Sequence, residues 1–133
     1  MKQFSLQIVT PDGTAFDGAA ESLLVHTTEG DVEFLAGHVD YTAALGTGRA
    51  RLTVNGEARY ASCSGGFLTV SAGQVKLICV TFEFAENIDL ERAKSAKEAA
   101  EQKIKDAKDE VALNLAKAKL ARALSRIKVA ELK

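Results

Sequence analysis

TFEFAENIDLERA, residues 81–93, is the stretch within which the composition of the chain changes from one kind of domain to another. All ten glycines, the single proline, six phenylalanines and two tyrosines of the 133-residue sequence precede residue 85. The 49 residues from there onward contain twelve alanines and none of those four types. The sequence therefore predicts two domains of different physical character, over residues 1–84 and 85–133.

The distribution of charge follows the same division. Residues 1–84 carry 5 basic and 9 acidic side chains, whereas residues 85–133 carry 12 basic and 9 acidic ones. The last 23 residues hold 6 basic residues and 1 acidic residue, so this end of the chain is strongly basic. The whole chain has a formal net charge of −1, which argues against a protein whose surface coats nucleic acid.

The overall composition limits the class of protein further. Apolar residues make up 47% of the chain and charged residues 26%, which are ordinary values for a folded globular protein. No apolar run approaches the length of about 18 residues that a membrane-spanning helix needs, so no such helix is predicted. The N-terminal residues lead directly into an alternating pattern, so neither a signal peptide nor a transit segment is expected.

The first domain has the pattern of short β-strands separated by turns. Phe4, Leu6 and Ile8 alternate with polar residues, as in a half-buried strand. Asn55-Gly56 is the strongest two-residue hairpin signal in the sequence. Short strands at regular spacing predict a β-sandwich or a barrel. The strands predicted from these runs cover residues 4–8, 23–25, 49–54, 57–63, 67–71 and 74–82.

The second domain has the pattern of amphipathic helix. Asn87 or Asp89 can cap an N-terminus by accepting hydrogen bonds from backbone N–H groups. Two apolar stripes at spacings of three and four follow, which predicts two helices in an antiparallel hairpin with a turn near residues 106–109. One long helix is the alternative, because neither Gly nor Pro marks the turn. The stripes consist of Ala93, Ala96, Ala100, Ile104, Ala107 and Val111, and of Leu113, Ala116, Leu120, Ala123, Ile127 and Ala130.

The helical stripes are rich in alanine, which affects how firmly the hairpin is held. Small side chains let helices approach closely, but each one buries little apolar area. We therefore expect the hairpin to be held weakly, both to itself and to the β domain. A mobile basic arm and a fixed two-helix bundle are both compatible with this pattern.

The sequence offers no constellation for catalysis or metal binding. Neither G-x-x-x-x-G-K-[ST] nor G-x-S-x-G occurs, so no phosphate loop or nucleophile elbow of those kinds is predicted. His26 and His38 lack metal-ligand spacing, and we interpret them as structural or interfacial residues. Cys63 and Cys79 match neither a zinc pattern nor a disulfide framework and are interpreted as buried free thiols in a reducing compartment. The chain is predicted not to be an enzyme.

Three arginines are the best candidates for a binding site. Arg122 and Arg126 are four residues apart, so they share one side of the second predicted helix. In a hairpin that turns near Lys108, Arg92 is level with position 124, between the two. Three guanidinium groups at one level repel one another unless an anion is present, and arginine suits bidentate contact with phosphate.

Two acidic residues are close enough in sequence to join such a site. Glu83 and Asp89 would balance the charge of the arginines or accept hydrogen bonds from the amino group of an adenine ring. The alternative interpretation is three solvated arginines on a helix surface. A nucleotide-sensing module is therefore one hypothesis for the function of the chain.

Several stretches, in order along almost the whole chain, resemble the epsilon subunits of F-type ATP synthases. The most specific is Ile88-Asp89-Leu90-Glu91-Arg92-Ala93, which resembles the IDxxRA motif of that family. The sequence departs from the family pattern at Ala36, where proline is usual, and at Ala99, where some ATP-binding members carry arginine. The other matching stretches are LQIVTPDG at 6–13 with Phe16 and Gly18, EGD at 29–31, GH at 37–38, ALGTG at 44–48 and SGGFLTV at 64–70.

The resemblance implies a fold and a function. The fold would be a β-sandwich of about ten strands followed by two antiparallel helices. The function would be that of a non-catalytic rotor subunit in the central stalk, in contact with the gamma subunit, the c-subunit ring and the catalytic alpha and beta subunits. The helical arm would extend to suppress ATP hydrolysis. No cofactor would be required, ATP would be a regulatory ligand of the folded arm, and nucleic acid would not be a partner.

The resemblance also assigns residues and a location. Glu29, Gly30 and Asp31 would face the c ring, and His38 would face the gamma subunit. The protein would lie on the cytoplasmic side of a bacterial inner membrane, bound to it only through the complex. A nucleotide-binding sensor unrelated to the synthase is the alternative function. The ATP-binding residues carried over from the family are Glu83, Ile88, Asp89, Arg92, Ala93, Arg122 and Arg126.

Overall fold

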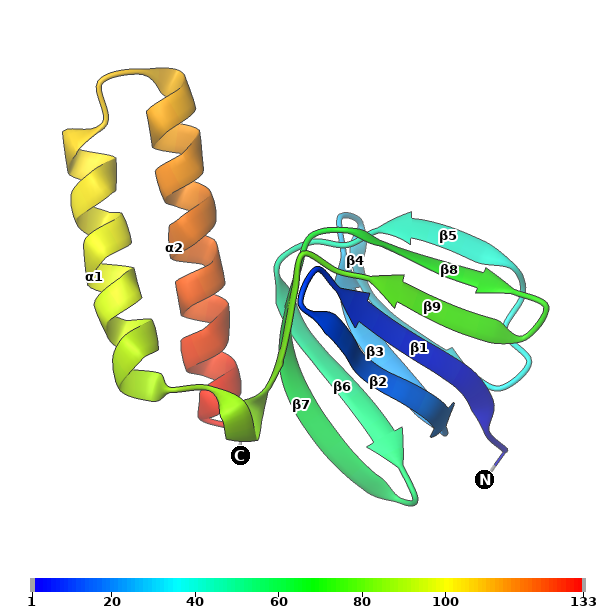
Figure 1. Ribbon diagram of the computed structural model, residues 1–133. Coiled ribbons are helices and arrows are strands. Elements are labelled where there is room, and N and C mark those ends of the chain that lie inside the picture. The colour runs from blue at the N-terminus through cyan, green and yellow to red at the C-terminus, as the bar shows by residue number, and fades with distance from the viewer. Residues whose placement is uncertain (1, 133) are drawn as a thin grey trace.

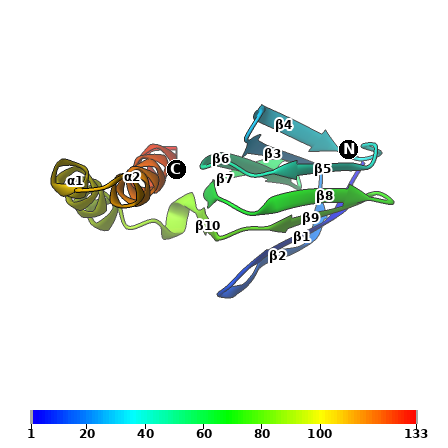
Figure 2. The ribbon, with the colours of Figure 1, turned by 90° about the horizontal axis from the view of Figure 1, so that it is seen from above.

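A computed structural model describes residues 2–132 and contains ten strands and two long helices. The strands form two five-stranded sheets packed face to face, and the helices stand side by side at one end of this sandwich (Figures 1 and 2). The predicted fold class is confirmed, and of the two β architectures the sandwich is the one adopted. The strands are β1 (Phe4–Thr10), β2 (Gly13–Ala20), β3 (Ser22–Thr27), β4 (Gly30–Leu35), β5 (Tyr41–Ala44), β6 (Gly48–Val54), β7 (Glu57–Ser64), β8 (Phe67–Ser71), β9 (Gln74–Ile78) and β10 (Thr81–Phe84).

The two sheets have the orders β2-β1-β9-β8-β5 and β10-β7-β6-β3-β4. Neighbouring strands are antiparallel except for β1 and β9, which are parallel. The predicted turn at Asn55-Gly56 joins β6 to β7, and both residues have positive φ, 52° and 79°, as a type I′ hairpin turn requires. Alternate residues of the strands point inward and form one apolar core, which includes Leu6, Ile8 and Phe34.

The strand predicted over residues 74–82 is wrong, because two strands in different sheets occupy that stretch. Residues 74–78 pair with β8, and residues 81–84 pair with β7 in the other sheet. The chain crosses between the sheets at Cys79 and Val80, whose N–H groups donate to the carbonyls of Val9 and Ser64 at 2.9 and 3.1 Å. Both N–H groups are therefore satisfied during the crossing, so no glycine or proline is needed to mark it.

The two cysteines meet at this crossing. Cys63 on β7 and Cys79 are both buried and free, and their sulfur atoms lie 3.5 Å apart. The hydrogen bond that Cys63 donates to Cys79 raises the pKa of the Cys63 thiol, and burial adds to this effect. Thiols in this environment behave as small apolar core residues.

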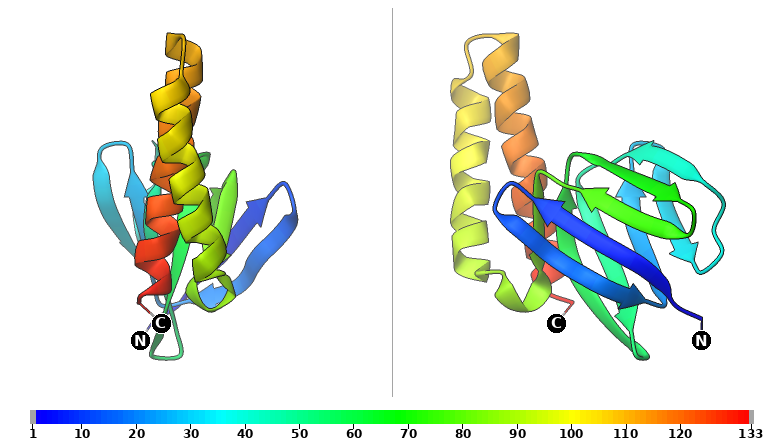
Figure 3. Two further views of the ribbon diagram at one scale, coloured as in Figure 1. Left: turned by 90° about the vertical axis from the view of Figure 1, so that its left-hand side faces the viewer. Right: turned by 45° about the vertical axis from the view of Figure 1, so that its right-hand side comes forward.

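The C-terminal domain is a helical hairpin. A short 3₁₀ turn (Ala85–Asn87) leads into α1 (Leu90–Asp106), and α2 (Glu110–Ala130) returns antiparallel to it (Figure 3). The side chain of Asp89 caps α1 by accepting from the N–H of Arg92 at 3.1 Å, and Asp109 caps α2 in the same way. Within residues 2–132, neither helix is long and apolar enough to cross a membrane.

The two helices pack along a line of buried alanines, here called the alanine seam: Ala93, Ala100, Ala116 and Ala123. Val111, predicted to belong to the apolar stripe of the first helix, is 70% exposed. The reason is that the chain turns before it, so Val111 begins α2 and follows that helix's periodicity. The tip of the hairpin therefore presents apolar side chains, including Leu115, to solvent.

The hairpin meets the sandwich through a second, much smaller core. We call the buried residues Ala85, Ile88, Val129 and Ala130 the joint core; Tyr60 on β7 and Leu90 pack against it. α2 also contacts β6 and β7 directly.

An arginine on the sandwich supports the same joint. Arg59 on β7 lies over the ring of Phe84 at 3.7 Å and forms an ion pair with Glu86. The guanidinium therefore bridges the last strand and the 3₁₀ turn that follows it. A few contacts at the base of the hairpin thus fix its position on the sandwich.

We predict that Val129→Ala loosens the hairpin without unfolding the sandwich. Val129 is 1% exposed, so truncation should remove about 1.5–3 kcal/mol from the local opening free energy of the hairpin. Hydrogen exchange at the C-terminal half of α2 measures this opening. Val111→Ala, the same change at an exposed position of α2, is the control, and equal exchange in both variants would contradict the role of the joint core.

Candidate functional site

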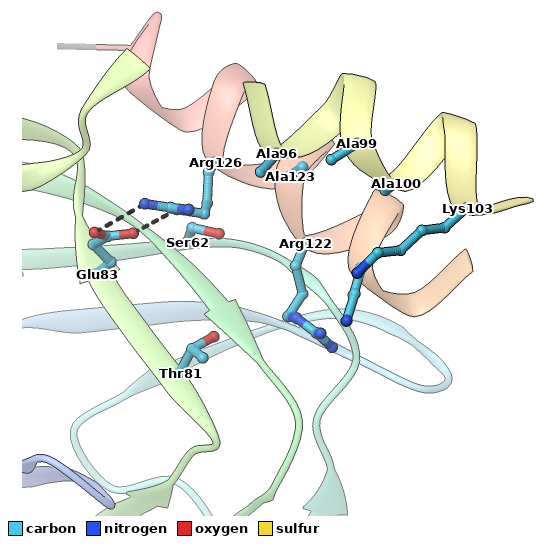
Figure 4. A pocket seen from close by; sticks show the side chains of 11 residues that line it. Ser62, Thr81, Glu83, Ala96, Ala99, Ala100, Lys103, Arg122, Ala123 and Arg126 are labelled. Carbon is cyan, nitrogen blue, oxygen red and sulfur yellow. Dashed lines mark hydrogen bonds and ion pairs between the residues drawn. The ribbon is translucent and has the colours of Figure 1, made fainter. Parts of the chain in front are cut away.

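A cavity of about 350 Å³ lies between the helical hairpin and the sandwich. Three parts of the chain enclose it: α1, α2, and the neighbouring strands β7 and β10 (Figure 4). Because the walls belong to both domains, the cavity has this shape only while the hairpin is packed against the sandwich. It is lined by Ser62, Thr81, Glu83, Ala96, Ala99, Ala100, Lys103, Lys119, Arg122, Ala123 and Arg126.

An ion pair closes the end of the cavity nearest the sandwich. Arg126 on α2 donates from Nε to Glu83 Oε1 at 2.8 Å and from Nη2 to Oε2 at 3.4 Å. Figure 4 shows the guanidinium turned toward the carboxylate. The two side chains are about one-third exposed or less, so the pair is only partly screened by water. The charge of Arg126 is therefore largely balanced within the protein.

A buried hydrogen bond lies beside this ion pair. The hydroxyl oxygens of Ser62 on β7 and Ser125 on α2 are 2.8 Å apart, and both residues are buried. One hydroxyl donates to the other, so the contact registers α2 against β7 at one level. A shifted position of the helix would leave these buried hydroxyls without each other, which is unfavourable.

Three cations gather at the opposite end of the cavity. Lys103 on α1 and Lys119 and Arg122 on α2 line it, and none has a carboxylate within ion-pair distance among residues 2–132. Lys103, in hydrogen-bonding reach of Lys119, lowers the pKa of the Lys119 ammonium, and Arg122 contributes to the same shift. The proximity of like charges, rather than burial, is the main cause.

The predicted nucleotide residues fall into two groups. Glu83, Arg122 and Arg126 line the cavity together, from β10 and α2. Arg92 is outside it: it is exposed and stands one turn before Ala96 on α1. Cα–Cβ bonds in a helix tilt toward its N-terminus, which for Arg92 is the direction of the hairpin base, away from Ala96.

Ile88, Asp89 and Ala93, the other three predicted residues, each have a structural role in the hairpin. Ile88 belongs to the joint core, Ala93 to the alanine seam, and Asp89 caps α1. These positions place the residues around the base of the hairpin, next to the cavity wall rather than in it. Their role in nucleotide binding stays a prediction.

The predicted interface residues Glu29, Gly30 and Asp31 lie at the turn between β3 and β4. Gly30 has φ +119°, which favours glycine, and Asp31 Oδ1 lies 2.8 Å from Nδ1 of His26. His26 and Asp31 face α2 across a second hollow of about 370 Å³. Gly48 leaves room for the imidazole, because a Cβ there would lie 2.8 Å from that of His26.

The remaining interface candidate lies in the loop between β4 and β5. The ring of His38 packs at 4.7 Å from that of Phe34 and at 5.9 Å from that of Tyr41. Its Nδ1 is 2.8 Å from the carbonyl oxygen of Val39. The histidine is half-buried and anchors the loop, and its contact with another subunit stays a prediction.

Apart from Glu83, sequence reasoning assigned none of the cavity's polar residues other than the arginines to a site. Ser62 and Thr81 have ordinary strand patterns, and their proximity to α2 depends on how the hairpin docks. No clear sequence signal pointed to Lys103 and Lys119. A turn near 108 places Lys103 level with position 113, so Lys119 lies about 9 Å further along the helix axis, and both lysines reach the cavity through their long side chains.

Comparison with protein families covers nearly the whole chain. Residues 3–85 match the family described as ATP synthase, Delta/Epsilon chain, beta-sandwich domain. Residues 86–131 match the family described as ATP synthase, Delta/Epsilon chain, long alpha-helix domain. Both matches agree with the folds of the two segments.

Similar proteins and structures agree with these families. An ATP synthase epsilon chain of Bacillus velezensis is 39% identical over 130 residues, covering 98% of each chain. One of Staphylococcus haemolyticus is 39% identical over 134 residues, covering all of both chains. The fold matches a chain in the cryo-EM structure of Euglena gracilis mitochondrial ATP synthase (OSCP/F1/c-ring), with a TM-score of 0.82 and 25% identity over 98% of this chain and 82% of that one.

A further structure supports the fold alone. A chain of the Tetrahymena thermophila mitochondrial ATP synthase, from its central stalk and c-ring, matches with a TM-score of 0.71 at 14% identity, over 97% of each chain. The family matches set aside the hypothesis of a sensor unrelated to the synthase.

We predict that the two buried serines are strongly coupled. Ser125→Ala leaves the hydroxyl of Ser62 buried without its partner, which should cost about 1–3 kcal/mol of docking stability. The double variant Ser62→Ala/Ser125→Ala should cost less than the sum of the single changes. A double-mutant cycle from hydrogen exchange in α2 measures this coupling, and strictly additive effects would contradict it.

Proposed function

The chain belongs to the ATP synthase delta/epsilon family and is similar to epsilon chains of that family. We propose that it is a non-catalytic rotor subunit of an F-type synthase whose helical hairpin regulates ATP hydrolysis. One observation carries the regulatory part: a cavity lined by arginine and carboxylate side chains lies between the folded hairpin and the sandwich, and its walls come from both. A ligand of that cavity would favour the folded hairpin over any opened one.

The proposed partners are the gamma subunit, the c-subunit ring and the alpha and beta subunits. The sandwich, which contains the larger apolar core, is proposed to hold the subunit in the central stalk, near the c ring. The two solved structures compared above come from synthases, in assemblies that include the c ring. The protein would then lie peripherally at a bacterial inner membrane, attached through the complex.

The tip of the hairpin supports the proposed contact with the catalytic subunits. Val111 and Leu115 are exposed on α2 and lie among the basic residues of the last segment. An apolar and basic helix of this kind suits an acidic partner surface, and the contact would weaken with salt. In the folded hairpin α1 and α2 cover each other, so opening would release a larger helical surface for docking.

The proposed regulatory ligand is ATP. Arg122 supplies a guanidinium without an acidic partner within residues 2–132, which suits phosphate, and Glu83 supplies an acceptor for an amino group. The alanines of the facing helices leave space for a planar ring between them. By linkage, ATP that binds only the folded state shifts the hairpin toward that state, and no further than its differential affinity allows. When ATP is scarce the arm would open and suppress hydrolysis.

We predict that Arg122→Ala weakens ATP binding at least about tenfold, because a charged hydrogen-bonding partner is lost. Arg92→Ala should also weaken it if the hairpin tightens around the nucleotide. Arg49→Ala, an exposed arginine on β6 outside the cavity, is the control and should bind ATP as the unaltered chain does. Calorimetric titration with ATP, and with ADP and GTP for selectivity, tests this; normal binding by both site variants would refute the nucleotide site.

We predict that a synthase core assembled with this chain hydrolyses ATP more slowly at low ATP concentration than the core without it. Val129→Ala should deepen the suppression, because it weakens the folded position of the arm. High ATP should relieve the suppression in both. Hydrolysis rates across a range of ATP concentrations measure this, and suppression that is independent of ATP would contradict regulation through the cavity.

A further inference from the structure

The turn Asn55-Gly56 has a chemical property that its role in the fold does not use. Its asparagine is the only one of three in the chain that precedes a glycine, since Asn87 and Asn114 precede isoleucine and leucine. Asparagine is among the chemically labile residues, and a following glycine favours its loss because, without a Cβ, it does not shield its own backbone nitrogen. Both residues of the turn are exposed, so water reaches them.

The reaction open to such a dipeptide is an intramolecular deamidation. The backbone nitrogen of Gly56 loses its proton and attacks Cγ of Asn55, and the new N–Cγ bond closes a five-membered succinimide ring. The bond from Cγ to the side-chain nitrogen breaks, and that nitrogen leaves with the proton as ammonia. Water then opens the ring at either carbonyl and gives aspartate or isoaspartate. The attack therefore requires the deprotonated nitrogen of Gly56.

A carboxylate is hydrogen-bonded to the proton that has to leave. Glu21 Oε1 accepts from the backbone N–H of Gly56 at 2.6 Å. Glu21 lies between β2 and β3 and is only 9% exposed, and its own N–H donates to the carbonyl of Thr53 on β6 at 2.8 Å. The backbone bond and the side-chain bond together hold the carboxylate against the tip of the β6–β7 hairpin.

This contact opposes the deamidation. A carboxylate is too weak a base to remove the proton from a backbone amide, and its charge strengthens the hydrogen bond to the intact N–H. The deprotonated nitrogen of Gly56 would be a second negative charge beside that of Glu21, whose burial limits screening by water. The contact thus stabilises the unreactive form of the nitrogen and destabilises the reactive one.

We propose that Asn55-Gly56 is a site of spontaneous deamidation and that the carboxylate of Glu21 protects it. Protection preserves the register of β6 and β7, because isoaspartate would add a methylene group to the backbone of a two-residue turn. Arg59 and Tyr60 follow on β7 and support the joint with the helical hairpin. The site lies outside the cavity, so this inference does not depend on the proposed function.

The first measurement uses the unaltered full chain. Base-catalysed hydrogen exchange passes through the same deprotonated nitrogen as deamidation, so exchange at the N–H of Gly56, followed by NMR, reports the protection directly. Its reference is Gly73, because Ala72 and Gly73 form a turn with the same pair of positive φ angles, 52° and 76°, in which the carboxylate of Asp40 accepts from Ala72 instead. We expect Gly56 to exchange about tenfold more slowly than Gly73. Equal exchange at the two glycines would overturn the protective role.

The second experiment compares the unaltered chain with Glu21→Gln and with Glu57→Gln as the matched control. Glu57 is exposed and directly follows Gly56, so its variant removes the same charge beside the same turn and leaves the acceptor of the hydrogen bond in place. Each protein is incubated at mildly alkaline pH and then briefly cleaved with trypsin, which releases residues 52–59 as one peptide. Mass spectrometry of that peptide measures the conversion of Asn55 to aspartate and isoaspartate.

We expect Glu21→Gln to deamidate at Asn55 about fivefold faster than the unaltered chain, because a neutral amide accepts a weaker hydrogen bond and does not repel the deprotonated nitrogen. Glu57→Gln should stay within about twofold, as expected for a solvent-screened charge. Asn87 and Asn114 should keep their rates, whereas a general loss of the fold would raise them; in that case the ratio of exchange at Gly56 and Gly73 decides. An unchanged or slower rate at Asn55 in a folded Glu21→Gln, or an equal rise in Glu57→Gln, would overturn the proposal.

Discussion

The position of the helical hairpin depends on the joint core, a patch of four buried side chains at its base. The seam that joins α1 to α2 is made of alanines, whose burial contributes little free energy each, so apolar burial at the base of the hairpin is the larger contribution. α2 makes the direct contacts with β6 and β7, and the Ser62–Ser125 hydrogen bond sets its register there. The way in which the hairpin docks on the sandwich therefore determines which residues form the walls of the cavity and where its charged side chains lie.

A cavity built in this way is sensitive to small changes in the position of the hairpin. Its carboxylate comes from β10, its arginines from α2 and one of its lysines from α1. The Glu83–Arg126 ion pair joins the sandwich to α2 and resists separation only modestly, because it is partly exposed. Opening of the hairpin would therefore dismantle the site as a unit. This is the property that a ligand-controlled arm needs, and a rigid bundle with a large apolar interface would lack it.

Much of the fold could be predicted from the sequence because local chemistry determines it. The change in composition near residue 85 separates strands from helices. Asn55-Gly56 predicts a hairpin turn because both residues readily adopt the positive φ angles that such a turn needs. The crossing at Cys79 could not be predicted, because backbone hydrogen bonds to distant strands stabilise it. The spacing of Arg122 and Arg126 predicts that they share one side of α2, and both line the cavity, but the positions of Lys103 and Lys119 in its lining depend on the docked geometry of the two helices.

The charges of the cavity give a ligand its influence over the hairpin. Lys103, Lys119 and Arg122 line one end of the cavity without an acidic partner among residues 2–132, while the joint core and the serine contact hold the hairpin in place. A ligand that binds the closed state ten times more tightly than the opened one shifts the equilibrium between them by about 1.4 kcal/mol. A polyanion would attract these cations as well as add contacts, so its effect on the hairpin would exceed that of a neutral ligand with the same contact area. For an arm held by alanines, control by charge is the more effective mechanism, because burial of apolar surface leaves so little free energy to adjust.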